Sequence, residues 1–424
     1  MKKIVTIILS VVLSVSALIS PVSASNDYED NGDFRYIYND DKSGYSEVLY
    51  RTPGKKGEID IKYPEEYKGK QVNRIGVTSY YDTRLEDTAT LSINTLYIPK
   101  TVEEVWFDCA NHPEHDSSVR RITNIRNIVV DKDNPYLCSK DGVLYSKDMK
   151  TLCLYPNRNS MTIYKMPDTV KSNTNYAEFY QRNKLKKIYF SDNLKELGEY
   201  CAAECKNLEY VYIGTNTKKI EDGAFSGDEK IKTIEIKSKK IKIIDNGVFA
   251  GCKSLKDIKL PKSVIKIKHS AFSNCKSLKK IQLPKGLKKL SNEAFNNCKS
   301  LKTIEIPDGI KKINRGTFND CKNLKKVTLS SNLQSISYSA FSDCKKLSRV
   351  VIKNKKIAPK ISYVKGMPDP TLLYESAFSN TKKGIKFYVK NKKVAKSLKK
   401  QLKGSGVRNA KILIGKKVVY KNVK

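Results

Sequence analysis

Residues 271–290 read A-F-S-N-C-K-S-L-K-K-I-Q-L-P-K-G-L-K-K-L, and this pattern recurs through the second half of the chain. Ile281 and Leu283 alternate as in a short strand with one inward face, and Pro284 then ends the strand pairing. Copies of the aromatic position lie 23 or 24 residues apart, at Ala202, Phe225, Phe249, Phe272, Phe295, Phe318 and Phe341. Such a period is typical of a leucine-rich repeat solenoid, whose units must stack because none can bury its apolar face alone.

The fold expected from this period is a β-rich solenoid. It is a leucine-rich repeat array with short parallel strands, irregular N-terminal repeats and a small α/β C-terminal cap, since an open array needs a different terminal unit. The expected division is a signal peptide at 1–24, an acidic disordered start at 25–33, degenerate repeats with insertions at 34–180, regular 23-residue repeats at 181–384 and the cap at 385–424.

The first 24 residues have the pattern of a secretory leader. Lys2 and Lys3 precede an apolar run that extends to Ile19, and small residues lead to Ala24. A membrane anchor is the alternative, but the run is short for a bilayer span of about 20 residues. We therefore expect a secreted, extracellular or cell-wall-associated protein with no transmembrane segment after cleavage.

The repeat pattern resembles the BspA-like leucine-rich repeat family, whose units read A-F-x-x-C-x-x-L-x-x-I-x-L-P, as at residues 271–284. Residues 133–156 contain D-N-P-Y, S-K-D-G-V-L-Y-S-K-D and L-Y-P, which is similar to an insertion found between such repeats. The resemblance implies the solenoid fold and a binding role at a cell surface, and it leaves the ligand open.

The cysteines follow the repeat more closely than they follow a disulfide framework. Six of the ten lie three residues after the aromatic position, at Cys205, Cys252, Cys275, Cys298, Cys321 and Cys344. We interpret them as small buried hydrophobic side chains, because a parallel register rarely gives disulfide geometry. Cys138 and Cys153 flank the inserted hairpin, and a disulfide between them is the alternative that stays open.

Candidate catalytic or metal-binding residues are few. Cys109, His112 and His115 form a weak Zn²⁺ candidate by residue type, but the spacing with Pro113 favours a surface loop. No base is accompanied by a third group that would orient it, as nucleophilic catalysis requires. We expect no cofactor and no enzyme, with a hydrolase or metal-dependent enzyme in residues 34–180 as the alternative from another class.

The charge is strongly basic and patterned. There are 81 Lys and Arg against 44 Asp and Glu, a net +37, and removal of the two leader lysines leaves +35. Two repeat positions are predicted to form lysine columns, Lys206, Lys253, Lys276, Lys299, Lys322 and Lys345, and Lys219, Lys266, Lys289 and Lys312. Such columns favour a polyanion such as an anionic cell-wall polymer, although repeat duplication and solubility alone would also produce them. Nucleic acid is not expected as the physiological partner.

Tyrosines mark the outward positions of several expected strands. Tyr97, Tyr189, Tyr210 and Tyr212, with Lys187 beside them, form the candidate ligand-binding set, because rigid aromatics are common anchors in interfaces. The alternative is strand stabilisation, since Tyr favours strands. We therefore expect a non-catalytic, adhesin-like monomer that presents an extended repeat surface to a protein or glycan ligand.

Overall fold

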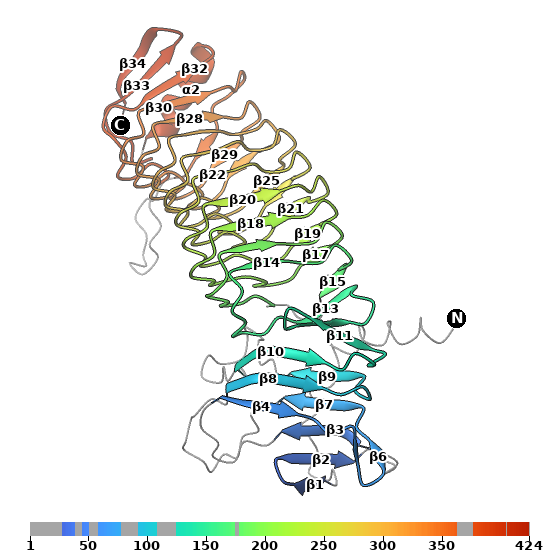
Figure 1. Cartoon of the computed structure of the whole chain (residues 1–424). Helices are drawn as coiled ribbons and strands as arrows, with labels where there is room; N and C mark the ends of the chain where they lie inside the picture. Colours follow the sequence, from blue (N-terminus) through green and yellow to red (C-terminus); the bar gives the residue numbers. More distant parts are fainter. Residues whose placement is uncertain are drawn as a thin grey trace. The chain divides into compact units, whose positions relative to one another are not determined.

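The computed structural model describes residues 28–38, 45–50, 58–77, 92–107, 124–173, 178–362, 376–403 and 405–423. The chain forms two compact units, unit 1 with Met1–Thr123 and Val130–Tyr136, and unit 2 with Asn124–Val129 and Leu137–Lys424 (Figure 1). The expected leader lies outside the described residues. Within those residues, no helix has the length and apolar character needed to cross a membrane.

Unit 1 consists of irregular strand pairs. Strand β3 (Tyr45–Tyr50) runs parallel to β7 (Arg74–Val77), which runs parallel to β9 (Glu104–Phe107). Strand β4 (Glu58–Lys62) pairs in parallel with β8 (Ser92–Ile98), and β5 (Glu66–Tyr67) forms a small hairpin with β6 (Lys70–Gln71). The strands β3, β7 and β9 thus form one parallel ladder, and β4 and β8 form another. These two ladders are the irregular N-terminal repeats that the sequence predicts.

The expected disordered start at 25–33 is wrong for residues 28–33. Strand β1 (Tyr28–Asn31) pairs antiparallel with β2 (Phe34–Tyr38), which in turn pairs with β3. Gly32, at a φ of 59°, allows the tight turn between β1 and β2. Acidic composition misled the prediction, because cross-strand pairing rather than local composition orders this segment.

The inserted hairpin opens most of unit 2. Strand β11 (Leu137–Lys140) pairs antiparallel with β12 (Val143–Ser146), and β12 with β13 (Thr151–Leu154). Asp141 and Gly142 both have positive φ, which is what a two-residue hairpin turn requires. Strand β13 then pairs in parallel with β15 (Ser172–Asn173), while β10 (Asn124–Val130) spans the sequence boundary between the units.

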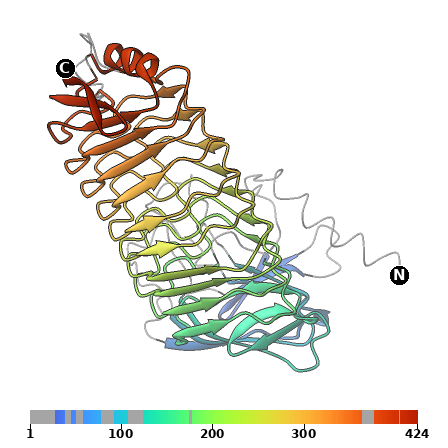
Figure 2. The same ribbon diagram turned by 90° about the horizontal axis from the view of Figure 1, so that it is seen from above.

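The repeats of unit 2 build two ladders of short strands (Figure 2). The first ladder comprises β14 (Ile163–Lys165), β16 (Lys187–Tyr189), β18 (Tyr210–Ile213), β20 (Thr233–Ile236), β22 (Asp257–Ile258), β24 (Lys280–Ile281), β26 (Thr303–Glu305), β28 (Lys326–Leu329), β30 (Arg349–Ile352), β32 (Lys386–Val389) and β33 (Ala410–Ile414). The second ladder comprises β17 (Glu196–Leu197), β19 (Lys219–Ile220), β21 (Ile243–Ile244), β23 (Lys266–Ile267), β25 (Lys289–Leu290), β27 (Lys312–Ile313), β29 (Ser335–Ile336) and β31 (Lys360–Ile361).

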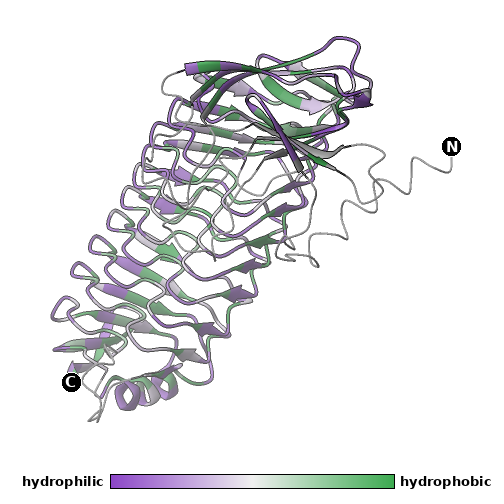
Figure 3. Ribbon diagram, turned by 90° about the horizontal axis from the view of Figure 1, so that it is seen from below, coloured by the Kyte–Doolittle hydropathy of each residue, from purple (hydrophilic) through white to green (hydrophobic). Residues whose placement is uncertain are grey.

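Paired strands of both ladders are parallel within the array. Ile188, Val211 and Ile234 share one register and are buried, whereas the residues on either side of each are exposed or half-buried. Hydrophobic and hydrophilic stretches therefore alternate along each rung and recur from rung to rung (Figure 3). The alternation predicted from I-x-L is confirmed.

A stack of phenylalanines fills one corner of the core. From Phe225 to Phe378, the ring centroids of consecutive rungs lie 5.2–5.9 Å apart with nearly parallel planes. Each ring is at most 1% exposed. Burial of each side chain contributes about 1.5–3 kcal/mol, and each ring pair adds about 0.5–1.5 kcal/mol.

The ladder cysteines lie beside this stack, as small buried side chains. Each thiol donates to the backbone carbonyl of the aromatic residue in a preceding rung, at 2.8–3.3 Å, for Cys205, Cys252, Cys275, Cys298, Cys321 and Cys344. All six are free thiols, and burial raises their pKa values. They are therefore poor nucleophiles and poor metal ligands in the folded chain.

One rung departs from the cysteine ladder. Asp228 occupies the cysteine position and is fully buried, and its Oδ1 accepts a 2.6 Å hydrogen bond from the Cys205 N–H. Its Oδ2 has no hydrogen-bond partner within the described residues. Burial raises the pKa of this carboxyl well above its usual value, more than the Cys205 N–H lowers it.

The C-terminal cap continues the first ladder before closing it. Strands β32 and β33 pair in parallel with the array, and β34 (Lys417–Val423) pairs antiparallel with β33. Helix α2 (Lys392–Leu402) is preceded by its N-cap Asn391, whose side chain accepts from the Val394 N–H at 3.0 Å, and the helix buries Val394, Ala395, Leu398 and Leu402. The small α/β cap expected from the sequence is confirmed, and β34 adds an antiparallel strand to it.

Candidate binding surface

Three tyrosines meet on the outward face of the first ladder, and we call Tyr189, Tyr210 and Tyr212 the tyrosine patch. Tyr189 pairs in register with Tyr212 of the next rung. The Tyr189 ring centroid lies 5.2 Å from that of Tyr210 and 6.2 Å from that of Tyr212. The Lys165 ammonium lies 5.7 Å from the Tyr189 ring centroid.

The tyrosine patch is half-buried rather than exposed as predicted. The Tyr210 hydroxyl donates to Glu235 at 2.6 Å, and the Tyr212 hydroxyl donates to Asp192 at 2.9 Å. Burial and the Asp192 carboxylate raise the pKa of Tyr212 to about 12. The hydroxyls of Tyr210 and Tyr212 are thus anchored to the scaffold, so these two rings have little conformational entropy to lose on binding, and Tyr189 packs against both.

The other two members of the predicted set have different places. Lys187 lies in register with Tyr210 and is exposed at the edge of the patch. Tyr97 lies on β8 in unit 1, where Lys62 is its register partner and the Lys62 ammonium lies 5.0 Å from the ring centroid. Tyr97 is therefore not part of the tyrosine patch.

The first predicted lysine column is interrupted. Glu229 occupies this position in the rung between Lys206 and Lys253, and its carboxylate forms an ion pair with Lys253. The uninterrupted part comprises Lys253, Lys276, Lys299, Lys322 and Lys345, of which Lys322 also lies 3.5 Å from Asp320. The prediction missed Glu229 because it followed the lysines that come after each cysteine, and this rung carries Asp228 in place of cysteine.

The second predicted column is interrupted too. On the second ladder, Ile243 separates Lys219 from Lys266, and Lys219 forms an ion pair with Glu221. Lys266 and Lys289 are direct register partners, and the next strand, β27, carries Lys312 at the same position. Only the part from Lys266 onward is a continuous basic column.

Sequence reasoning overlooked a third column, which we call the flank column: Lys256, Lys279, Lys302 and Lys325. The backbone N–H of each later lysine donates to the carbonyl of the one before, at 2.9, 3.2 and 2.8 Å. All four side chains are exposed. The 23-residue period could have revealed this column, since the four residues hold the same repeat position.

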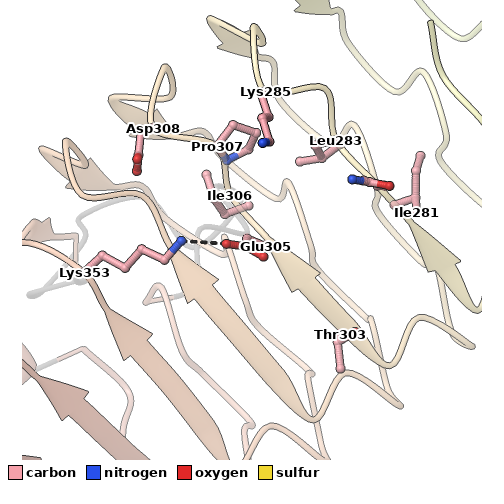
Figure 4. A pocket seen from close by; sticks show the side chains of 10 residues that line it. Ile281, Leu283, Lys285, Thr303, Glu305, Ile306, Pro307, Asp308 and Lys353 are labelled. Carbon is pink, nitrogen blue, oxygen red and sulfur yellow. Dashed lines mark hydrogen bonds and ion pairs between the residues drawn. The ribbon is translucent and has the colours of Figure 1, made fainter. Parts of the chain in front are cut away.

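A shallow cavity of about 600 Å³ lies where the first ladder is interrupted between β24 and β26 (Figure 4). Its lining comprises Ile281, Gln282, Leu283, Lys285, Thr303, Glu305, Ile306, Pro307, Asp308 and Lys353. Lys353 donates to Glu305 at 2.6 Å across two rungs. Pro284 and Pro307 shorten these strands because proline cannot donate to a ladder, and no sequence motif marked the resulting hollow.

Catalytic geometry is weak in the part of the chain that the structure describes. His269 Nε2 lies 3.2 Å from the Ser270 hydroxyl, but His269 Nδ1 faces the Asn292 backbone carbonyl instead of a carboxylate. No group of three or more metal-binding side chains occurs among the described residues. Cys109, His112 and His115 lie outside those residues, so the zinc candidate stays an untested prediction.

The possible disulfide is absent from this structure. Cys138 and Cys153 are both free thiols. Cys138 donates to the Ser146 carbonyl at 3.3 Å, while burial raises the pKa of Cys153 to about 12.

The family model described as the BspA type leucine rich repeat region matches residues 153–256 and 242–363, with 6 copies. The chain belongs to the BspA-type leucine-rich repeat family. The BspA-type family suggests a repeat-based binding role for proteins that are secreted or held at the cell surface, and such proteins are generally non-enzymatic. The expected resemblance is thereby confirmed.

Three of the solved structures similar to this BspA-type chain are leucine-rich repeat proteins from bacteria. A leucine-rich repeat protein from Bacteroides ovatus has 20% identity, covers 85% of this chain and 78% of its own, and has a TM-score of 0.48. One from Eubacterium ventriosum has 19% identity, with 69% and 93% covered and a TM-score of 0.47. A leucine-rich cell surface protein from Faecalibacterium prausnitzii has 17% identity, with 78% and 96% covered and a TM-score of 0.41.

These structural likenesses are too distant to carry an argument, so the family assignment rests on the repeats. No curated protein matches the chain.

Proposed function

We propose that this protein is a non-catalytic, adhesin-like binding protein, secreted or attached to the cell wall. Its tyrosine patch, on the first ladder, binds a protein or glycan ligand. The observation that supports this proposal is the packing of Tyr189, Tyr210 and Tyr212 into one rigid group. Three rings on two neighbouring rungs offer apolar faces next to carboxylates and Lys187, which is the mixture that anchors ligands in interfaces.

A second candidate function is charge-based attachment to an anionic cell-wall polymer. It is favoured by the continuous lysines from Lys253 to Lys345 and by the flank column. Lysines stacked at roughly 5 Å repel one another and attract counter-ions, which a polyanion can replace. The two functions are compatible, because the tyrosine patch and these lysines lie on different rungs.

The tyrosine patch can be tested by capture on immobilised glycans and extracellular-matrix proteins. The full chain is compared with Tyr189→Ala/Tyr210→Ala/Tyr212→Ala and with Tyr388→Ala, which removes a half-buried tyrosine from the same outward column at the far end of the ladder. We expect the triple variant to lose more than about 2 kcal/mol of binding free energy, the size of an interface hot spot.

The control variant Tyr388→Ala should bind as the wild type does. Capture by the triple variant at wild-type affinity, with both variants folded by circular dichroism, would contradict the proposed role of the patch.

A further inference from the structure

Acidic partners are distributed unevenly along the array. At the repeat position of the flank column, earlier rungs carry Lys186, Glu209 and Lys232, and the Glu209 carboxylate lies 2.8 Å from the Lys232 ammonium. An ion pair also joins Lys237 to Glu235. The rungs before the flank column are therefore partly neutralised.

The flank column itself lacks such pairs. Its four lysines occupy consecutive rungs, and none forms an ion pair within the described ranges of the chain. Because each ammonium faces only like charges in its own column, a counter-ion atmosphere must gather there. Release of those ions is the driving force that a polyanion would exploit.

A second basic column occurs in the same repeats as the flank column. Three residues earlier in each repeat lie Lys276, Lys299 and Lys322. One residue later, the same four rungs carry Asp257, Lys280, Thr303 and Lys326, and the Lys280 ammonium lies 3.9 Å from the Asp257 carboxylate. The rungs between residues 276 and 326 thus carry two lysine columns, with Lys280 and Lys326 beside them.

We propose that this basic flank, centred on Lys279, Lys302 and Lys325, is the binding site for a linear polyanion that lies along the stacking direction of the rungs. The inference rests on the second candidate function and gives it a location. Lysine dominates the site, and lysine acts as a point charge without the fixed fork geometry of arginine. The site therefore recognises charge density along a chain, with phosphate or carboxylate as the anionic group.

The site also sets a minimum ligand length. Four rungs span about 14 Å at the strand spacing of parallel ladders. A polymer that reaches all four rungs contacts all four lysines at once, whereas a single anion contacts only one of them. Long-chain polyphosphate should therefore bind, and inorganic phosphate at the same phosphate concentration should not compete with it.

The experiment compares two double variants of the full chain that each remove two charges from one repeat position. Lys279→Gln/Lys302→Gln changes the flank column, and Lys186→Gln/Lys232→Gln changes the rungs that contain Glu209. Binding to immobilised long-chain polyphosphate and to polygalacturonate is measured across a salt series. The two polymers distinguish a phosphate ligand from a carboxylate ligand.

We expect the flank variant to bind about 5-fold more weakly per lysine removed, with a shallower dependence on salt. The matched variant should stay close to wild type. Equal weakening by both variants, with wild-type binding intact, would refute the location and leave polyanion attachment standing. Absence of salt-sensitive binding by the wild type to either polymer would refute both.

Discussion

Replacement of Asp228 by asparagine should change how the stability of unit 2 depends on pH. The Asp228 carboxyl is fully buried in the cysteine ladder, and burial raises its pKa well above the usual value. The unfolded chain loses this proton near pH 4, whereas the folded chain keeps it to higher pH. The unfolded state then binds fewer protons than the folded state, so stability falls as the pH rises.

The magnitude follows from one proton. Between the unfolded and the folded pKa of Asp228, the wild type should lose about 1.4 kcal/mol per pH unit from this group, and above the folded pKa the loss should level off. Asp228→Asn is neutral throughout and nearly isosteric, so it should not have this contribution. Asp228→Cys, which restores the ladder residue, should behave in the same way.

The assay is urea unfolding followed by far-ultraviolet circular dichroism between pH 3.5 and pH 8. The informative quantity is the difference between variant and wild type, because other titrating groups cancel in it. Both variants should gain stability relative to wild type as the pH rises above about 4. A difference that stays constant over the whole range would show that Asp228 is not held protonated and would refute the reasoning.

Two further predictions concern the core. Phe295→Ala removes a fully buried ring that stacks on Phe272 and Phe318; it should cost about 3–5 kcal/mol in urea unfolding, and a loss below about 1 kcal/mol would be inconsistent with a packed stack. The six ladder thiols should be inert to a thiol reagent in the native protein and should all react after denaturation without reductant; fewer than six reactive thiols in the denatured chain would mean that ladder cysteines form disulfides.

The repeat period was enough to predict most of the architecture. Phe272, Cys275 and Leu278 recur at fixed spacing, so the stack, the thiol ladder and the parallel strands follow from the period. The hydroxyl partners of the tyrosine patch did not follow, because Glu235 belongs to the next rung and Asp192 to a turn, and only the register brings them close.

The lysine columns show how a sequence alignment can mislead. One rung carries Asp228 and Glu229 where its neighbours carry Cys and Lys. Because the prediction followed the lysines that come after cysteines, the column looked continuous across this rung, and the flank column at another repeat position was missed. Tyr97 was grouped with the patch by its repeat position, but it belongs to a different compact unit. Where the 23-residue period is interrupted, the sequence pattern no longer predicts which residues are neighbours in space.

The central claim is that the outward face of the first ladder is the ligand-binding surface. Hydroxyl-radical footprinting of the full chain, with and without a ligand captured from the glycan or matrix arrays, tests it without any mutation. We expect protection of Tyr189, Tyr210 and Tyr212, while Tyr136, which is 47% exposed in unit 1, keeps its reactivity. Protection elsewhere with an unchanged tyrosine patch would contradict it.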